Sequence, residues 1–261
     1  MTAPAGLTSV GALWWREVLR FVRQRSRLVG AFAQPLVFWV LLGGGFSASF
    51  RPPGTGESVG ALQYFYPGII ALVLLFTAIF ATIAVVEDRK SGFLQGVLVA
   101  PIPRASIVLG QALGGTTLAV LQGALFLALA PLAGIPLSTA SVVAVLLVLT
   151  AVAFALTSLG LLIAWRMDST QGFHAIMNLI LMPIWLLSGA FFPAAGAPGW
   201  LGWIIRLNPL TYGMAALRRA LYLRAPAAIG AVPPLTISIL VTLAFCVLAF
   251  GGATLVARRA D

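Results

Sequence analysis

The amino-acid sequence predicts an all-α, polytopic membrane protein, and three observations support this fold class. The 261 residues are 61% hydrophobic and only 8% charged, whereas soluble proteins are typically about 45–50% apolar and about 25% charged. A mean hydropathy of +1.04 leaves too little polar surface to solvate a globule. Six stretches are also apolar over enough residues to cross a hydrocarbon core, which takes about 20 helical residues.

We predict six transmembrane helices at residues 28–46, 65–86, 107–132, 141–165, 173–192 and 234–256. Strands are a poor alternative, because the strands of a membrane barrel alternate apolar and polar residues over about ten positions. Residues 69–75, in contrast, are apolar throughout. The whole chain, residues 1–261, is therefore expected to form a single transmembrane domain.

Lys and Arg residues in the connections predict the orientation of the bundle, because they accumulate in cytoplasmic segments. Eleven of the 16 lie in the first 27 residues, in the second and fourth connections and in the C-terminal tail. Five lie on the other side, four of them after the fifth span. We therefore expect both termini in the cytoplasm. The net charge of +10 would suggest a nucleic-acid partner for a soluble protein, but here it predicts contact with anionic membrane lipid and no nucleic acid.

Residues 1–27 are expected to form a cytoplasmic tail with an amphipathic helix on the membrane surface. They do not match a cleavable signal peptide, whose apolar core is about 7–15 residues long, although Ser47-Ala48-Ser49 resembles a cleavage site. Because a helix rotates by about 100° per residue, residues 13–25 would place an arginine stripe on one face and Trp14 and Trp15 on the other. The arginine face would meet phosphates and water, and the tryptophan face would meet lipid. The stripe consists of Arg16, Arg20, Arg23 and Arg27. A basic flank that only sets topology is the alternative.

The predicted spans contain almost none of the ionisable side chains that ion-coupled carriers and intramembrane enzymes use. Glu87 and Asp88 end the second span, Asp168 lies in a loop and His174 begins the fifth span. The single cysteine, Cys246, excludes an internal disulfide and a cysteine-based metal site. We expect no catalytic residue, no metal and no cofactor in this chain.

A phosphate-binding loop for ATP is also excluded. Such a loop has the pattern G-x-x-x-x-G-K-[ST], and the only lysine, Lys90, follows Val85-Val86-Glu87-Asp88-Arg89. The chain is therefore not expected to be an enzyme, and an ATP-driven function would need a partner protein.

The densest charge cluster, residues 87–90, opens the connection between the second and third spans. About eight to ten following residues are able to form a short helix, which Pro101 and Pro103 would stop. Exposed between two spans, such a helix suits docking to a soluble partner, with Phe93, Leu94 and Leu98 filling a groove. A solvated charged loop is the alternative.

Two segments of the chain carry recognisable motifs. The first segment is Glu87-Asp88-Arg89-Lys90-Ser91-Gly92-Phe93-Leu94, then Leu98-Val99-Ala100-Pro101-Ile102-Pro103-Arg104. The second is Ser188-Gly189-Ala190-Phe191-Phe192-Pro193, then Pro198, Trp200 and Leu201, then Asn208-Pro209-Leu210-Thr211-Tyr212 and Leu217-Arg218. Both segments resemble permease subunits of type-2 ABC exporters, and with the six spans the resemblance covers nearly the whole chain.

The resemblance implies a bacterial inner (plasma) membrane protein that exports polysaccharides, lipid-linked glycans, drugs or other amphiphiles. Two permease subunits, identical or sister, would pair, and each would dock a separate ATP-binding subunit that holds ATP and Mg. Residues 87–104 would contain the coupling helix that seats in this ATPase. Its interface would consist of Glu87, Asp88, Arg89, Lys90, Gly92, Phe93, Leu98, Pro101 and Arg104. The basic N-terminal helix, with Trp14, Trp15, Arg16, Arg20 and Arg23, would also approach the ATPase.

By the same resemblance, residues 193–233 form an extracytoplasmic segment whose short helices, near 198–207 and 209–222, re-enter the outer leaflet. Asn208 is placed to cap the second helix and Pro209 to occupy its first position. Arg206 and Arg218 are expected to anchor helix ends at the headgroups, or else to meet lipid phosphate or an anionic substrate. The candidate residues of this segment are Pro193, Trp200, Arg206, Asn208, Pro209, Tyr212 and Arg218.

Gly110 and Gly114, with Gly115 beside them, allow another helix to approach closely. The sequence leaves open whether that helix belongs to the same subunit or to a second one.

These observations favour the membrane subunit of an ATP-driven exporter, in which nucleotide binding by the partner pushes the coupling helix and reorients two bundles. A non-energised channel or assembly scaffold is the alternative from another class, and the resemblance disfavours an importer. The few polar residues at membrane depth, among them Gln34, Gln122 and Asn178, favour an amphiphilic substrate. They do not identify it, and the sequence does not distinguish a homodimer from a heterodimer.

Overall fold

A computed structural model describes residues 5–46, 59–191 and 198–259. The described residues form helices and contain no strand, which confirms the all-α class. The helices are α1 (Ala5–Arg23), α2 (Arg25–Phe46), α3 (Ala61–Lys90), α4 (Phe93–Val99), α5 (Arg104–Leu127), α6 (Thr139–Ala164), α7 (Thr170–Trp185), α8 (Gly199–Leu207), α9 (Pro209–Leu221) and α10 (Leu235–Arg259). Three short turns, η1 (Ala130–Ala133), η2 (Leu186–Ala190) and η3 (Pro226–Ala228), complete them.

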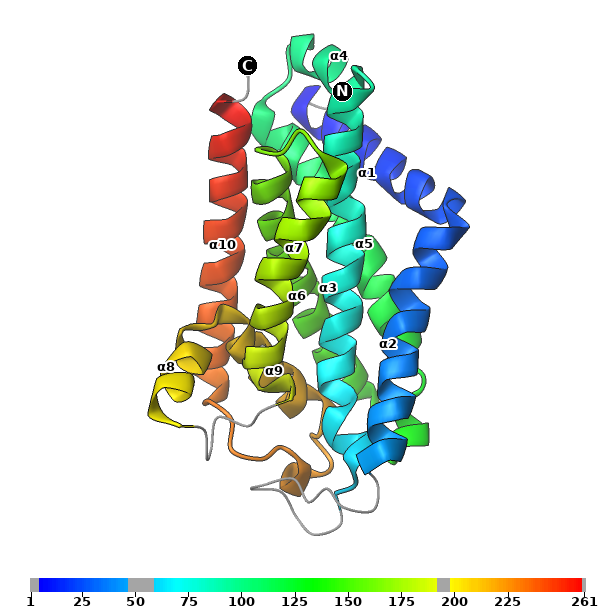
Figure 1. Ribbon diagram of the computed structural model, residues 1–261, viewed down its shortest axis with the longest axis vertical. Helices are drawn as coiled ribbons and strands as arrows, with labels where there is room; N and C mark the ends of the chain where they lie inside the picture. The colour runs from blue at the N-terminus through cyan, green and yellow to red at the C-terminus, as the bar shows by residue number, and fades with distance from the viewer. Residues whose placement is uncertain (1–4, 47–58, 192–197, 260–261) are drawn as a thin grey trace.

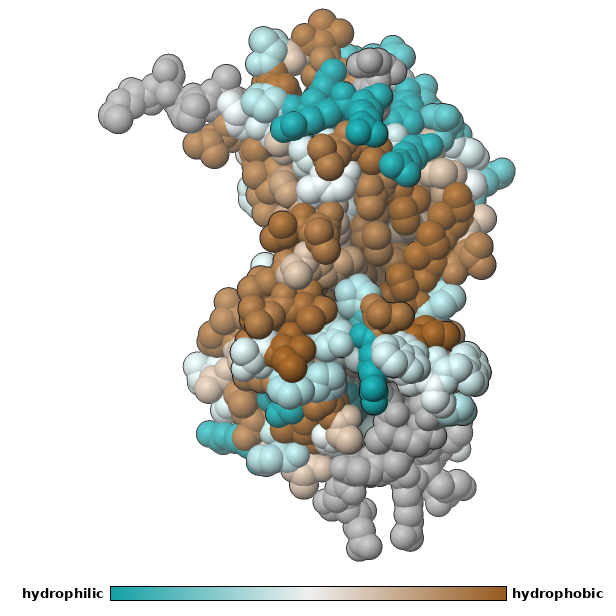
Figure 2. Space-filling view, turned by 90° about the vertical axis from the view of Figure 1, so that its left-hand side faces the viewer, coloured by the Kyte–Doolittle hydropathy of each residue, from teal (hydrophilic) through white to brown (hydrophobic). Residues whose placement is uncertain are grey.

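Five helices in the described part of the chain are long and apolar enough to cross a membrane: α3, α5, α6, α7 (continued by η2) and α10. They run side by side along the bundle, while α1 crosses one end of it obliquely and leads into α2 (Figure 1). The face drawn in Figure 2 carries a broad hydrophobic band between hydrophilic groups near both ends, as lipid contact requires. The polytopic membrane class is confirmed. The apolar part of α2, Phe32–Gly45, is shorter, so a sixth span remains a prediction.

Local backbone chemistry decides where the spans end. α3 begins at Ala61 and continues to Lys90, beyond the predicted 65–86, and Gly92 then turns the chain with a φ of +77°. α5 stops at Leu127 rather than residue 132, because a short 3₁₀ turn with Pro131 follows and Gly134, at a φ of +74°, reverses the chain.

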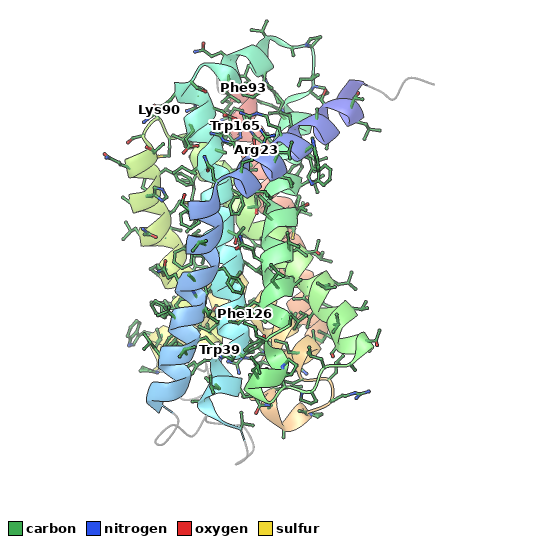
Figure 3. The ribbon with its side chains drawn as sticks, turned by 90° about the vertical axis from the view of Figure 1, so that its right-hand side faces the viewer. Arg23, Trp39, Lys90, Phe93, Phe126 and Trp165 are labelled. Atoms are coloured by element: carbon green, nitrogen blue, oxygen red, sulfur yellow. The ribbon has the colours of Figure 1, made fainter. Side chains whose placement is uncertain are left out.

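α3 is the central helix, and aromatic contacts hold α2 against it. Residues 69–75 of α3 are at most 1% exposed, so the most apolar run is buried by protein on all sides. Trp39 of α2 packs edge to face on Tyr66 of α3 and Phe126 of α5, with ring centroids 5.4 and 5.7 Å apart. Figure 3 shows Trp39 and Phe126 facing each other between their helices.

The small residues of α5 mark a close approach within one chain. A Cβ on Gly110 would lie 2.8 Å from Leu13 Cβ, and one on Gly114 would lie 2.6 Å from Glu17 Cβ. Gly115 faces Thr157 of α6 in the same way, with Thr157 Cγ2 at 2.6 Å from the site of a Cβ. Gly110 and Gly114 therefore seat α1 on α5, which answers the question of the partner helix that the sequence left open.

Candidate functional site

The helix α4 projects from one end of the bundle, where α1 begins and α10 ends (Figure 1). We call this end the α4 end and the opposite one, which carries α8, the α8 end. Gly92 provides the left-handed turn that separates α4 from α3, and α4 ends at Val99, shortly before Pro101 and Pro103. The short helix expected in this connection is therefore present.

The outer surface of α4 is apolar and accessible. The side chain of Val99 is 86% exposed and that of Phe93 is 41% exposed, whereas Leu94 is buried against the bundle. Leu98 is half-buried and Pro101 is exposed. Lys90 and Phe93 are both at this end of the bundle in Figure 3. The exposed apolar residues form a surface that another protein can cover.

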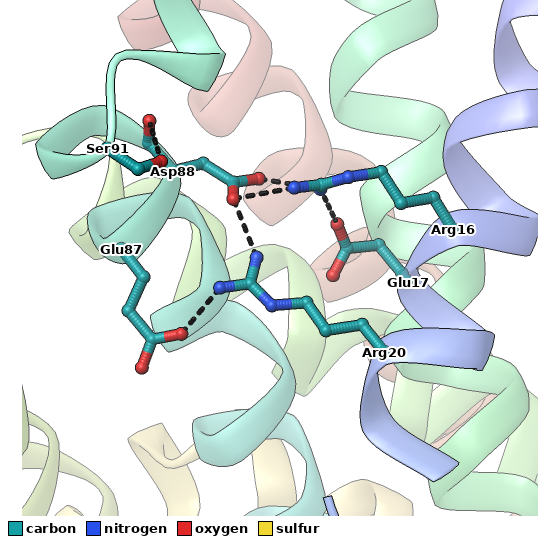
Figure 4. Close-up of polar contacts among 6 residues, drawn as sticks. All are labelled: Arg16, Glu17, Arg20, Glu87, Asp88 and Ser91. Carbon is teal, nitrogen blue, oxygen red and sulfur yellow. Dashed lines mark hydrogen bonds and ion pairs between the residues drawn. The ribbon is translucent and has the colours of Figure 1, made fainter. Parts of the chain in front are cut away.

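The acidic residues before α4 pair with α1. Asp88 is 2% exposed. Its carboxylate accepts two hydrogen bonds of 2.7 Å from Arg16 and one of 2.6 Å from Arg20. Arg20 also donates to Glu87 at 2.7 Å (Figure 4). These residues form the acid–arginine cluster, together with Glu17, to which Arg16 donates at 2.8 Å.

The acid–arginine cluster corrects two expectations. Arg16 and Arg20 do not turn toward phosphates and water as the helical stripe predicted, because the glycines of α5 bring α1 across the bundle, above the end of α3. Asp88 is likewise not available to a partner protein, since α1 covers it. Glu17 belongs to this cluster but was not predicted from the sequence. It is the only acidic residue among the arginines of residues 1–27, and this isolation could have indicated an ion pair.

Burial raises the pKa of Glu17 to about 7, and the charge of Asp88 adds to the rise while Arg16 opposes it. Between about pH 4.5 and 7 the folded protein therefore holds a proton that the unfolded chain releases. The contribution of the Glu17 carboxyl to the free energy of unfolding is therefore fully present below about pH 4.5. It is lost as the pH rises through about 7.

Glu17→Gln should therefore stabilise the protein increasingly as the pH rises. We expect the gain in free energy of unfolding to grow to about 3 kcal/mol between pH 5 and pH 8, measured from thermal melts of the purified protein in buffered detergent. Asp168→Asn, at a carboxylate that is 86% exposed, is the control for removing an acidic side chain at this end of the bundle. A gain that does not change with pH would contradict the raised pKa.

A second set of contacts ties the end of α3 to the connection between α6 and α7. Arg89 donates to the carbonyl oxygen of Trp165 at 2.7 Å, to that of Met167 at 3.3 Å and to Asp168 at 2.9 Å. Arg16 adds a cation–π contact with the ring of Phe93 on α4, at 3.8 Å. The base of α4 is thus held by α1 on one side and by the α6–α7 connection on the other.

The remaining predicted residues at the α4 end are more accessible. Lys90, Arg23 and Trp15 are exposed, and Arg104 is half-buried at the start of α5. Trp14 donates from Nε1 to Thr117 of α5 at 3.0 Å, which adds a polar contact to the seating of α1.

At the α8 end, the Asn-Pro-Leu-Thr-Tyr segment fastens α8, α9 and the end of α7 together. Asn208 caps α9 by accepting from the Leu210 N–H at 3.0 Å, with Pro209 at the first position, as expected. Its amide also donates to the Ile184 carbonyl at 2.6 Å. Tyr212 donates to the Arg206 carbonyl at 2.9 Å. These contacts explain the segment as a three-helix joint.

The arginines at the α8 end differ from one another. Arg206 and Trp200 are exposed, but Arg218 is only 4% exposed. Arg218 therefore does not anchor a helix end at the membrane surface, because α9 turns it into the protein.

Pro193 lies outside the described residues. Among the described residues, no three His, Cys, Asp or Glu side chains lie close enough to hold a metal ion.

Comparisons with known proteins identify the family and relatives of this chain. Residues 8–222 match the family model described as ABC-2 type transporter. The chain is 28% identical to the ycf38 transport permease of Cyanophora paradoxa over 206 residues, which cover 78% of this chain and 70% of that one. It is 28% identical to nodulation protein J of Neorhizobium galegae over 224 residues, covering 84% and 83%. It is 26% identical to the inner membrane transport permease YadH of Escherichia coli K12 over 212 residues, covering 79% and 80%.

Proposed function

Because the chain belongs to the ABC-2 type transporter family, as a multi-pass transport permease, we propose that it is the membrane subunit of an ATP-driven exporter. It pairs with a second permease subunit, identical or sister, and each subunit docks a separate ATP-binding protein. The α4 end faces the cytoplasm, with both termini, and α2 is the first of six spans. No ATP or Mg is bound by this chain itself.

The observation that carries the proposal is the combination of an exposed tip and a fixed base in α4. The tip offers Val99 and Pro101 to a partner. The base is held by buried ion pairs to α1 and by hydrogen bonds to the α6–α7 connection. A force applied to the tip is therefore transmitted to α1, α3, α6 and α7 instead of bending a loop. Nucleotide binding by the partner then shifts the population between two arrangements of the bundles.

An amphiphilic or lipid-linked substrate fits the composition of the spans. Gln122 is buried and accepts a hydrogen bond of 2.7 Å from Thr77, so it serves helix packing. Gln34 and Asn178 are exposed on the bundle surface. Spans with so few polar side chains suit the transport of a molecule with a large apolar part.

Val99→Glu tests docking at α4 without touching the contacts at its base. Charge reversal at Glu87 or Arg89 would break contacts inside the chain as well, so it does not separate docking from folding. The permease is co-purified with the ATP-binding subunit encoded beside it, and with a library of other ATP-binding subunits if none is adjacent. We expect Val99→Glu to reduce the recovered ATPase about tenfold or more, because a charge would be buried at an apolar contact.

Leu132→Glu is the matched control, since Leu132 is 74% exposed and lies after α5, at the α8 end. It should retain the partner. If Val99→Glu also retains it, α4 is not the docking helix. If the unmodified chain recovers no ATPase at all, a channel or scaffold explains the protein better than an exporter.

A further inference from the structure

Arg218 is a buried cation without an acidic partner. It lies on α9 and is 4% exposed, and none of the ion pairs among the described residues includes it. Burying a charge is costly unless it is paired and hydrogen-bonded. The neighbouring Arg219 is only half-buried, and it donates to the carbonyl oxygens of Val232 and Pro233 at 3.1–3.3 Å.

The protein satisfies Arg218 only in part. A guanidinium carries five N–H donors, but the hydrogen bonds of Arg218 to described residues leave from one nitrogen, Nη2. They reach the carbonyl oxygens of Tyr64 at 3.4 Å and Gly189 at 3.3 Å, both longer than the usual 2.9–3.0 Å. The guanidinium carbon also lies 4.5 Å from the centre of the Tyr64 ring. None of these groups carries a negative charge.

Arg218 borders a cavity of about 40 Å³ at the α8 end. Ser188, Gly189 and Thr211 form one side, and residues 229–233, which connect α9 to α10, form another. One water needs roughly 10–15 Å³ of such space, so the cavity has room for about three waters or one compact group. Ile205 and Met214 add apolar lining.

The residues around the cavity indicate its depth in the membrane. Trp200 and Trp203 on α8 are 68% and 65% exposed, and exposed tryptophans of membrane proteins concentrate at the lipid–water interface. The planar guanidinium fork matches the oxygens of a phosphate in two parallel hydrogen bonds. The apolar lining suits the part of a lipid next to its headgroup.

We propose that Arg218 and the cavity beside it bind the phosphate of an amphiphile at the membrane interface. The phosphate provides the negatively charged partner that Arg218 does not find among the described residues of the protein. This site would hold a headgroup whether or not the chain works as an exporter, so its test does not require the ATP-binding partner.

The test uses the full chain purified in an uncharged maltoside detergent and titrated with a short-chain lysophosphatidylglycerol. Inorganic phosphate is titrated separately. The readouts are the shift of Tm and the phospholipid retained in native mass spectrometry. We expect the lysolipid to raise Tm saturably, and Arg218→Gln to raise its apparent Kd about tenfold or more, because charge-assisted hydrogen bonds are lost. Arg224→Gln, at an exposed arginine of the same end, is the control and should bind like the parent.

A second variant separates binding from folding. Ala231 is exposed and lines the cavity, so Ala231→Phe should obstruct it without touching Arg218, and should also weaken lysolipid binding. Equal binding by the parent and both variants would overturn the proposal. So would a full shift of Tm by inorganic phosphate with no further shift by the lysolipid, because the ligand would then be a free anion.

Discussion

Asp88→Ala is expected to lower the free energy of unfolding by about 3–5 kcal/mol, the usual cost of removing one partner from a buried ion pair. The carboxylate of Asp88 is the only group that receives hydrogen bonds from both Arg16 and Arg20 among the described residues. Without it, Arg16 keeps only Glu17 and Arg20 keeps only Glu87 as an acidic partner among the described residues. We therefore expect α1 to detach from the end of α3, with a large drop in Tm in detergent and faster proteolysis within α1.

Asp168→Ala is the matched control for this prediction. Asp168 also pairs with an arginine, Arg89, at the same end of the bundle, but its side chain is 86% exposed. Exposed pairs contribute about 0–1 kcal/mol, so this variant should melt close to the parent. Similar losses of Tm in the two variants would show that burial of the acid–arginine cluster does not contribute to the stability of the protein. Asp88→Asn combined with Arg20→Gln should lose less than the sum of the single variants, because the two side chains interact directly.

Gly114→Leu is expected to have an effect of similar size through packing. A Cβ at this position would lie 2.6 Å from Glu17 Cβ, and α1 would have to move away from α5 to accommodate it. Overpacking alone typically costs about 1–3 kcal/mol, and the movement also separates Arg16 and Arg20 from Asp88. We expect a Tm loss approaching that of Asp88→Ala, together with loss of the co-purified ATP-binding subunit.

Gly11→Leu on α1 controls for the change of residue type. A Cβ at Gly11 meets nothing within 4 Å, and leucine favours a helix over glycine by roughly 1 kcal/mol, so this variant should be as stable as the parent or slightly more so. If Gly114→Leu were equally well tolerated, the close approach of α1 and α5 would not be required for the fold.

The helices were predictable from the sequence because their signals are local. Runs such as residues 69–75 are apolar whatever surrounds them, and a Ser, Asn or Pro in the right position begins a helix. Thus five of the six predicted spans, the short helices near 198–207 and 209–222, and the cap by Asn208 agree with the structure to within a few residues. The ends of α5 and α7 were less predictable, because the apolar sequence continues through the turns η1 and η2.

The pairing of charges was not predictable in the same way. A helical wheel places Arg16 and Arg20 on one stripe, but it does not say what that stripe faces. The answer depends on Gly110 and Gly114, about 90–100 residues later in the chain, which bring α1 over Asp88. Arg206 and Arg218 look equivalent in sequence, yet only Arg218 is buried.

The sequence by itself determined that this chain is a helical membrane protein, which follows from residue type and spacing over a few turns of helix. The permease family was indicated by the resemblance of its motifs. Only the tertiary structure decided which charges are paired, that α4 has a fixed base, and that one arginine faces a cavity without an acid. The physical reason is that burial and ion pairing arise from contacts between distant segments, so their energies are not properties of any local stretch.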